Sequence, residues 1–132
     1  MALKRKIACI DLYSEQIDIK SIPRAWRHKF LGGRGLNAYL LYKHLPLGCD
    51  PLGADNVVII GSGLLGGTLT APIDCTDVVT KSPLTQLLGR ARSSGFFASE
   101  MRWAGFDHLV IKGRARRPVY LFVHNGRIQI RN

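Results

Sequence analysis

The chain has 132 residues, of which 46% are hydrophobic and only 21% are charged, and this balance excludes a disordered protein. Its length supplies one hydrophobic core and little more, so we expect a single domain over residues 1–132, which further sequence could complete at the C-terminal end. Nineteen Lys and Arg against nine Asp and Glu give a formal charge of +10, which favours an anionic partner such as a phosphorylated cofactor or an acidic protein face.

The first elements along the chain are predicted to be a β-hairpin and a helix. Residues 6–13 and 16–22 are predicted to be its two strands, and in the second Ile17 and Ile19 alternate with Asp18 and Lys20, as in a strand with one wet face. Pro23 then suits the first turn of a helix, in which Ile22, Trp26 and Phe30 recur at a spacing of four. Gly32-Gly33 ends this helix, because glycine adopts the left-handed cap conformation at little cost.

The middle of the chain is predicted to alternate helix, strand and loop. Residues 36–45 indicate a second helix that stops at Pro46, and residues 57–60 indicate a central buried strand. A glycine- and threonine-rich loop follows over residues 61–70. Val78-Val79 indicates another buried strand, which leads through a loop to a helix that starts near Phe96 and ends at Gly105.

The C-terminal third is predicted to be strands. Residues 109–111 form one, and residues 119–123 and 128–130 flank Asn125-Gly126, a strong hairpin signal. Few helices among many strands make this an α+β fold. Because the chain stops on its last strand, that edge stays unpaired unless the sheet closes on itself or a partner or further sequence covers it.

Two places are candidates for binding an anion. Ser93 and Gly95 precede the helix near Phe96, where free backbone N–H groups suit a phosphate, although serine here also fits an ordinary helix cap. Arg34 lies between glycines and suits either a cofactor or a helix carboxyl end.

We assign no catalytic or metal-binding residue to the chain. The four histidines, which show no metal-binding spacing, are interpreted as surface or capping residues: His28, His44, His108 and His124. Cys9, Cys49 and Cys75 are isolated, as expected of reduced thiols in a cytoplasmic protein. No apolar run reaches the length of a membrane span. A pI near 10.1 is typical of nucleic-acid-binding proteins, but no helix has a concentrated basic face, so this class of function is not favoured.

Several segments in order resemble the N-terminal domain of the aldehyde:ferredoxin oxidoreductase family. They are Phe30-Leu31-Gly32-Gly33-Arg34-Gly35-Leu36, Asp50-Pro51-Leu52-Gly53, the residues 78–85 and 93–107, and Pro118-Val119-Tyr120-Leu121. The resemblance implies two stacked, mostly antiparallel sheets with a few short helices, which form the base under a tungsten or molybdenum bis-pterin cofactor. It also implies that Arg34, Ser93 and Gly95 contact this cofactor.

The resemblance further implies that the chain is a cofactor-binding domain or small subunit and is not catalytic alone. Full-length members add helical domains that carry a [4Fe-4S] cluster, which three scattered cysteines cannot hold. We therefore expect a larger oxidoreductase chain with that cluster as partner, or self-association.

Three departures from the family pattern support an alternative. Cys75 stands where the family has an arginine, Arg92 where it has an asparagine, and Ser94 where it has a glycine. Losing the arginine at position 75 removes a charged hydrogen bond worth about 1.5–3 kcal/mol, and Arg92 could restore that charge from another direction. The alternative is a cofactor-free relative that acts as a protein interaction or assembly module.

Overall fold

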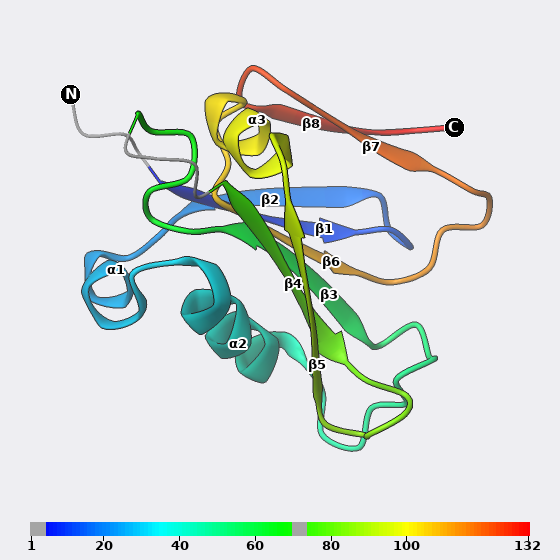
Figure 1. Ribbon diagram of the computed structural model, residues 1–132. Coiled ribbons are helices and arrows are strands. Elements are labelled where there is room, and N and C mark those ends of the chain that lie inside the picture. Colours follow the sequence, from blue (N-terminus) through cyan, green and yellow to red (C-terminus); the bar gives the residue numbers. More distant parts are fainter. Residues whose placement is uncertain (1–4, 70–73) are drawn as a thin grey trace.

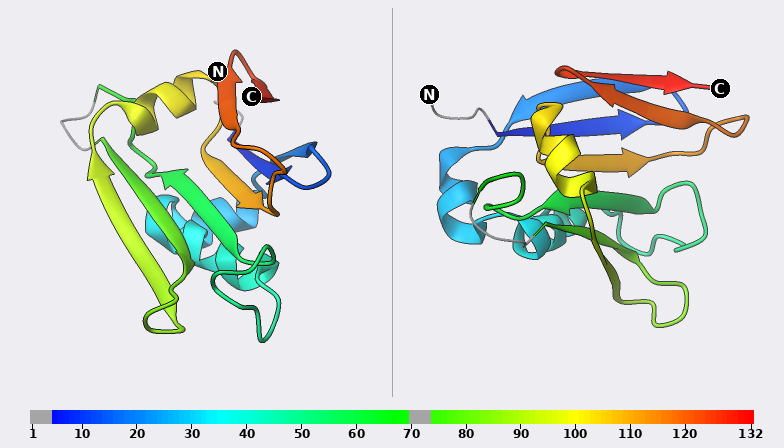
Figure 2. Two further views of the ribbon diagram at one scale, coloured as in Figure 1. Left: turned by 90° about the vertical axis from the view of Figure 1, so that its right-hand side faces the viewer. Right: turned by 45° about the horizontal axis from the view of Figure 1, so that its top comes forward.

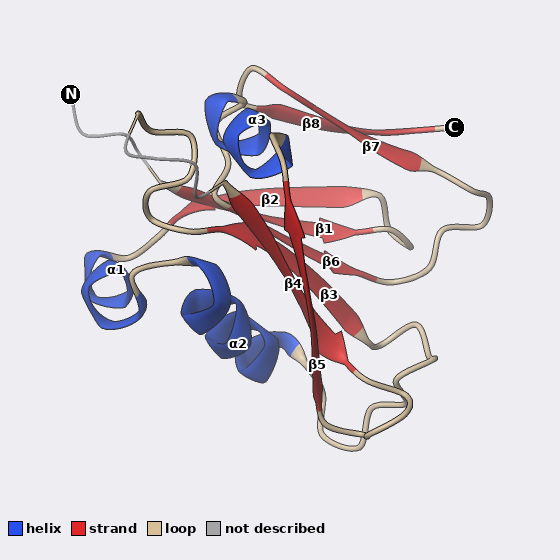
Figure 3. Ribbon diagram, viewed as in Figure 1, coloured by secondary structure: helices blue, strands red, loops and turns tan. Residues whose placement is uncertain are grey.

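The computed structural model describes residues 5–69 and 74–132, and these form two sheets and three helices (Figure 1). The larger sheet has six strands in the order β2-β1-β6-β3-β4-β5, and β7 pairs with β8 in the smaller one (Figure 3). The strands are β1 (Lys6–Asp11), β2 (Gln16–Ser21), β3 (Val57–Ser62), β4 (Cys75–Lys81), β5 (Leu88–Ser94), β6 (His108–Lys112), β7 (Tyr120–His124) and β8 (Arg127–Arg131). The expected α+β fold with two mostly antiparallel sheets is confirmed, with one parallel pair, β1 and β6.

One face of the larger sheet is covered by α1 (Arg24–Phe30) and α2 (Gly33–His44) (Figure 1). Ile22 is fully buried under α1, as the spacing of its apolar residues predicts. Trp26 and Phe30 both contact the Tyr39 ring of α2, at centroid distances of 4.9 and 4.7 Å. The predicted stripe therefore joins the two helices. The core on this face consists of Ile7, Ile22, Leu36, Leu40, Leu41, Val57, Ile59, Val79 and Val110.

The opposite face is covered by α3 (Phe97–Trp103) and by the β7-β8 hairpin, which lies over the sheet as a second layer (Figure 2). Its core consists of Ala8, Ile10, Met101, Phe106, Leu109 and Ile128. The predicted turn between the two strands is confirmed: Asn125 and Gly126 have φ values of 43° and 74°, as a two-residue hairpin turn requires.

Strand β5 corrects the predicted loop between Val79 and Phe96. Its seven residues pair with the whole of β4, from Cys75 opposite Ser94 to Lys81 opposite Leu88. As an edge strand with mostly exposed side chains, it carries none of the apolar alternation by which strands are recognised.

Candidate functional site

A cluster of buried charges lies at the end of the large sheet where β1 and β6 begin. Asp107 Oδ1 accepts a hydrogen bond from Arg5 Nε at 2.9 Å and lies 3.5 Å from Arg102 Nε. Its other oxygen accepts the Lys6 backbone N–H at 2.9 Å. All three charged side chains are nearly buried, so the single carboxylate balances two guanidinium groups inside the fold.

Arg102 also holds the loop that follows β3. Its Nη1 donates to the carbonyl oxygens of Gly63, Leu64 and Gly66. Trp103 Nε1 donates to Gly67 O at 3.1 Å. The segment predicted to be an irregular loop is therefore anchored to α3 by side-chain donors.

A buried His–Asn pair lies beside this cluster, on the α2 face. His108 Nδ1 is 2.7 Å from Asn37 Oδ1, and Asn37 Nδ2 donates to Asp77 O at 2.9 Å. Because the Asn37 oxygen faces the imidazole, Nδ1 carries the proton and Nε2 is an acceptor, which is buried without a partner among the described residues. Burial, and then the Arg5 and Arg102 charges, lower the pKa of His108 to about 3. The interpretation of His108 as a surface or capping residue is therefore wrong.

This pKa predicts that stability falls as the solution is acidified. Below about pH 6.5 the unfolded chain binds a proton at His108, while the folded chain does not until about pH 3. The contribution of neutral His108 to the free energy of unfolding is therefore fully present above pH 6.5 and is lost as the pH falls from 6.5 to 3. At about pH 5 the loss is about 2 kcal/mol. Urea unfolding of the chain at the two ends of this pH range measures the fall in the free energy of unfolding. The double variant Asn37→Ala, His108→Ala should show a flatter pH dependence, and an equal one would contradict the assignment.

The predicted anion site lies at the corner where β5 leads into α3. Arg92 Nη2 is 2.9 Å from Cys75 Sγ on the neighbouring strand, and its guanidinium is exposed. Gly95 has a φ of +123°, and a Cβ there would meet none of the described residues within 4 Å, so these residues leave the surface beside it open. Its N–H, however, donates to Asp74 O at 3.2 Å.

One backbone N–H in the first turn of α3 is bound by a carboxylate of the chain itself. The helix begins at Phe97, and Asp74 Oδ2 accepts the Ser99 N–H at 3.2 Å and also the Ser99 hydroxyl. Asp74 thus takes one of the amides that the sequence suggested for a phosphate, and its backbone carbonyl takes the Gly95 N–H, so side chains are the main remaining donors known at this corner.

The structure brings Arg34 and Arg92 to one face of the sheet and places Ser93 on the other. Arg92 opposes Asp77 and Ser93 opposes Thr76, and successive residues of a strand face opposite sides. Asp77 shares its face with Val79, which packs against α2. Arg34 is exposed in the first turn of that helix.

The buried groups escaped the sequence interpretation because the chain places them far apart. A signal was available for Asn37, which recurs with Leu36, Leu40 and Leu41 on the buried stripe of α2. An amide in such a stripe needs a buried partner, and His108 at the head of an apolar strand is a candidate. Arg5 and Asp107 gave no comparable signal.

Comparison with known proteins shows the family. A sequence model described as the aldehyde ferredoxin oxidoreductase N-terminal domain matches residues 7–132. The chain belongs to this family. The resemblance noted in the sequence is thereby confirmed, and the aldehyde ferredoxin oxidoreductase domain accounts for the fold described above.

The relatives of this aldehyde ferredoxin oxidoreductase domain are much longer proteins. The tungsten-containing aldehyde ferredoxin oxidoreductase of Pyrococcus furiosus is 38% identical over 123 residues, covering 93% of this chain and 20% of the relative. The Thermococcus kodakarensis enzyme of the same name is 36% identical over an equal length. The P. furiosus aliphatic sulfonate oxidoreductase, WOR-like subunit, is 36% identical over 134 residues. The chain spans about a fifth of the length of these relatives.

A solved structure shares the fold. The active site complex BamBC of benzoyl coenzyme A reductase, in complex with 1,5-dienoyl-CoA, contains a chain that superposes with a TM-score of 0.92 at 31% identity. The match covers 96% of this domain and 19% of the solved chain.

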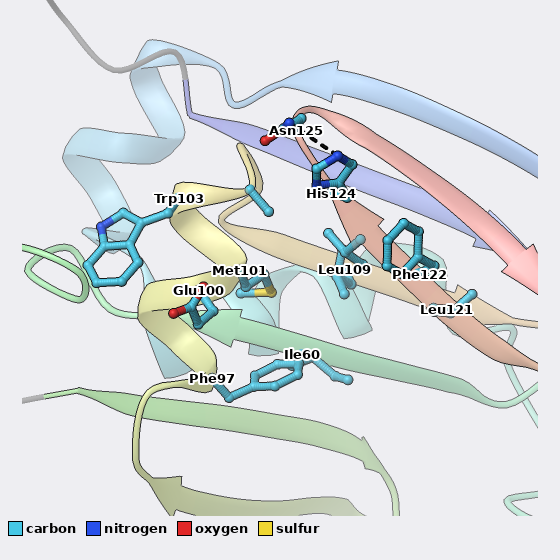
Figure 4. A pocket seen from close by; sticks show the side chains of 12 residues that line it. Ile60, Phe97, Glu100, Met101, Trp103, Leu109, Leu121, Phe122, His124 and Asn125 are labelled. Atoms are coloured by element: carbon cyan, nitrogen blue, oxygen red, sulfur yellow. Dashed lines mark hydrogen bonds between the residues drawn. The ribbon is translucent and has the colours of Figure 1, made fainter.

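An apolar hollow of about 610 Å³ opens between α3 and the β7 strand of the oxidoreductase domain (Figure 4). Its floor is formed by Ile60 and Leu109, and Phe97 and Trp103 stand at its margin with exposures of 56% and 63%. In the described residues, no group of three His, Cys, Asp or Glu side chains could hold a metal ion. The described part of the chain also has no helix long and apolar enough to cross a membrane.

Proposed function

We propose that the chain is the part of an aldehyde ferredoxin oxidoreductase-type enzyme that contacts the phosphate-bearing end of a tungsten or molybdenum bis-pterin cofactor. The observation that carries this proposal is the Arg92–Cys75 contact at the β4-β5 corner. A guanidinium group is retained at this corner although position 75 is a cysteine, and the open surface at Gly95 leaves room beside it.

The corner fits a phosphate group through side chains. Arg92 supplies a forked, exposed donor, and Arg34 lies on the same face of the sheet. The open surface at Gly95 would leave room for the group, whereas the Ser93 side chain faces the other side of the sheet, so only its backbone could border the group. The bound cofactor supplies the redox chemistry, and these residues bind and orient it.

The same proposal includes a larger partner chain in the cytoplasm. The three cysteines are far apart in the sequence and the chain spans about a fifth of its relatives, so the partner would carry the [4Fe-4S] cluster. Phe96, Phe97 and Trp103 of the α3 region are exposed by 79%, 56% and 63%, and the partner would cover them together with the apolar hollow.

Production together with such a larger chain tests the proposal. We expect the complex to contain tungsten or molybdenum and pterin, and Arg92→Gln to weaken cofactor retention about tenfold, because one charged hydrogen bond is lost. Metal analysis and pterin fluorescence of the purified complex measure this. Arg127→Gln, on the exposed side of β8, is the matched control and should leave retention unchanged.

A complex free of metal and pterin would instead support the second candidate, a cofactor-free interaction module. That candidate is favoured by Asp74, whose carboxylate already accepts the Ser99 N–H in the first turn of α3. In that case, restoring the family residues with Cys75→Arg and Arg92→Asn should add no pterin affinity.

A further inference from the structure

Positive charge is concentrated in the last part of the chain. Residues 108–132 contain six of the nineteen Lys and Arg residues and no Asp or Glu. Lys112 of this group is paired with Asp11 at 3.2 Å, whereas the other five form no ion pair in the described part of the chain. All five are exposed arginines: Arg114, Arg116, Arg117, Arg127 and Arg131. Their charges are therefore available to an anionic partner.

The outer face of the β7-β8 hairpin, called the hairpin face below, places two of these arginines beside a row of aromatic rings. The inner face packs in the core through Leu121, Val123, Ile128 and Ile130. The alternate residues lie on the outer face as three cross-strand pairs, which are Tyr120 opposite Arg131, Phe122 opposite Gln129, and His124 opposite Arg127. Tyr120 and Phe122 are exposed by 52% and 38%. Because strands and not a helix carry this face, the helical spacing of basic residues gives no sign of it in the sequence.

The arginine at the end of β8 is held in place on the hairpin face. Arg131 Cζ lies 4.1 Å from the centroid of the Phe122 ring, and Arg131 Nε and Nη2 both donate to Gln129 Oε1, at 3.0 and 2.6 Å. The Phe122 and His124 rings are neighbours, with centroids 5.6 Å apart and planes inclined by 33°. The Arg131 guanidinium is thus oriented over an aromatic ring before any ligand binds, and its remaining N–H donors are available to a phosphate oxygen.

A cleft continues the hairpin face at the end where β8 stops. The loop between β6 and β7, the turn between β1 and β2 and the end of β8 lie together at one end of the molecule (Figure 1). They enclose a cleft of about 310 Å³, whose lining includes Tyr13, Arg116, Arg117 and Asn132. Asn132 directly follows Arg131, and the Tyr13 ring is 73% exposed. One acidic side chain, the exposed Glu15, lines the cleft against the two arginines.

The alternation of rings and cations favours a single-stranded polynucleotide over an acidic protein surface. The carboxylates of a protein partner would pair with the guanidinium groups but not with the exposed rings. The bases of an unpaired strand stack on aromatic rings and on guanidinium planes, while its phosphates pair with arginines alongside. Only the polynucleotide therefore uses both rows of side chains on the hairpin face.

We infer that the hairpin face and the adjoining cleft bind single-stranded nucleic acid. Bases stack on Tyr120 and on the Arg131 guanidinium over Phe122, and phosphates bind the arginines of the face and the cleft. Phe122 and His124 also line the apolar hollow, but Tyr120 and the arginines lie outside it. The hairpin face contains none of the residues of the proposed cofactor site, so this binding does not rest on the proposed function.

Titration of a fluorescently labelled oligouridine RNA of about 12 nucleotides with the chain, followed by fluorescence anisotropy, tests the inference. We expect saturable binding with a Kd of about 10 μM at low salt. The slope of log K against log salt should be about −3, as expected for about four contacts between arginine and phosphate on a single strand. Polyglutamate at an equal concentration of negative charge should displace the RNA only weakly, because it offers no bases to the rings.

Matched variants separate stacking from charge. Tyr120→Ala should weaken RNA binding about tenfold and leave the salt slope unchanged, because it removes a ring and no charge. Tyr120→Phe keeps the ring and should bind RNA as the unaltered chain does. Tyr42→Ala removes an exposed ring from α2 and should have no effect. Arg131→Gln should make the salt slope less steep by about 0.7, whereas Arg24→Gln, at the exposed start of α1, should not change it.

Several outcomes would overturn the inference. The absence of saturable binding at low salt would show that the hairpin face does not bind RNA. Unchanged affinity in Tyr120→Ala, or equal effects of Arg131→Gln and Arg24→Gln, would show attraction by the net charge alone. Full displacement of the RNA by polyglutamate would instead identify an acidic protein as the occupant.

Discussion

Replacing Asp107 by asparagine is expected to lower the free energy of unfolding by about 3–5 kcal/mol, because it leaves the buried guanidinium groups of Arg5 and Arg102 without a counter-charge. The substitution keeps the size of the side chain, so the loss reports charge and not packing. The NH2 group of the asparagine would also replace one of the two carboxylate oxygens and so face a donor, either Arg5 Nε or the Lys6 N–H. Equilibrium unfolding in urea measures the change.

Asp18→Asn is the matched control for this prediction. Asp18 pairs with Lys20 at 2.6 Å, but both side chains are well exposed, so solvent screens the interaction. We expect no measurable change in stability. A loss at Asp107 below about 1 kcal/mol would show that the buried cluster is solvated or neutralised in another way.

Gly61→Ala is expected to cost about 3–4 kcal/mol in the free energy of unfolding, since no room exists for a methyl group at this position. Gly61 lies in the central strand β3, opposite His108 on one side and Asp77 on the other. An added Cβ would overlap both His108 Nδ1 and Asn37 Oδ1. Those atoms are fully buried and hydrogen-bonded to each other, so neither can move aside without breaking the pair.

Gly63→Ala, two residues further along, separates this overlap from a general loss of glycine. A Cβ at Gly63 meets nothing within 4 Å, and its φ is not positive. We expect a change below about 1 kcal/mol for this variant. Thermal and urea unfolding of the two variants side by side test the difference, and equal losses would refute a steric role of the His–Asn pair.

Local patterns in the sequence predicted most of the fold. The β1-β2 and β7-β8 hairpins, the two N-terminal helices and the buried strands follow from alternation, glycine caps and the Asn125-Gly126 turn. Strand β5 could not be predicted in this way, because its position depends on hydrogen bonds to β4 and its residues have no buried face.

The candidate site was predictable only in part. Gly95 lies at the corner between β5 and α3, and the carboxylate that accepts the Ser99 amide of α3 comes from Asp74, more than twenty residues earlier. Whether Arg34, Ser93 and Gly95 contact a cofactor stays a prediction. The charge balance around Asp107 depends on residues 102 positions apart, and such a pairing leaves no trace in local spacing.

The close packing at Gly61 also limits how related sequences can diverge. A related sequence with a side chain at position 61 needs smaller residues in place of Asn37 and His108, because the side chains at these three positions would occupy the same space. A single substitution at one of these positions gives an unstable protein, so we expect the three residues to change together. Related sequences should have either glycine, asparagine and histidine or three small apolar residues at these positions.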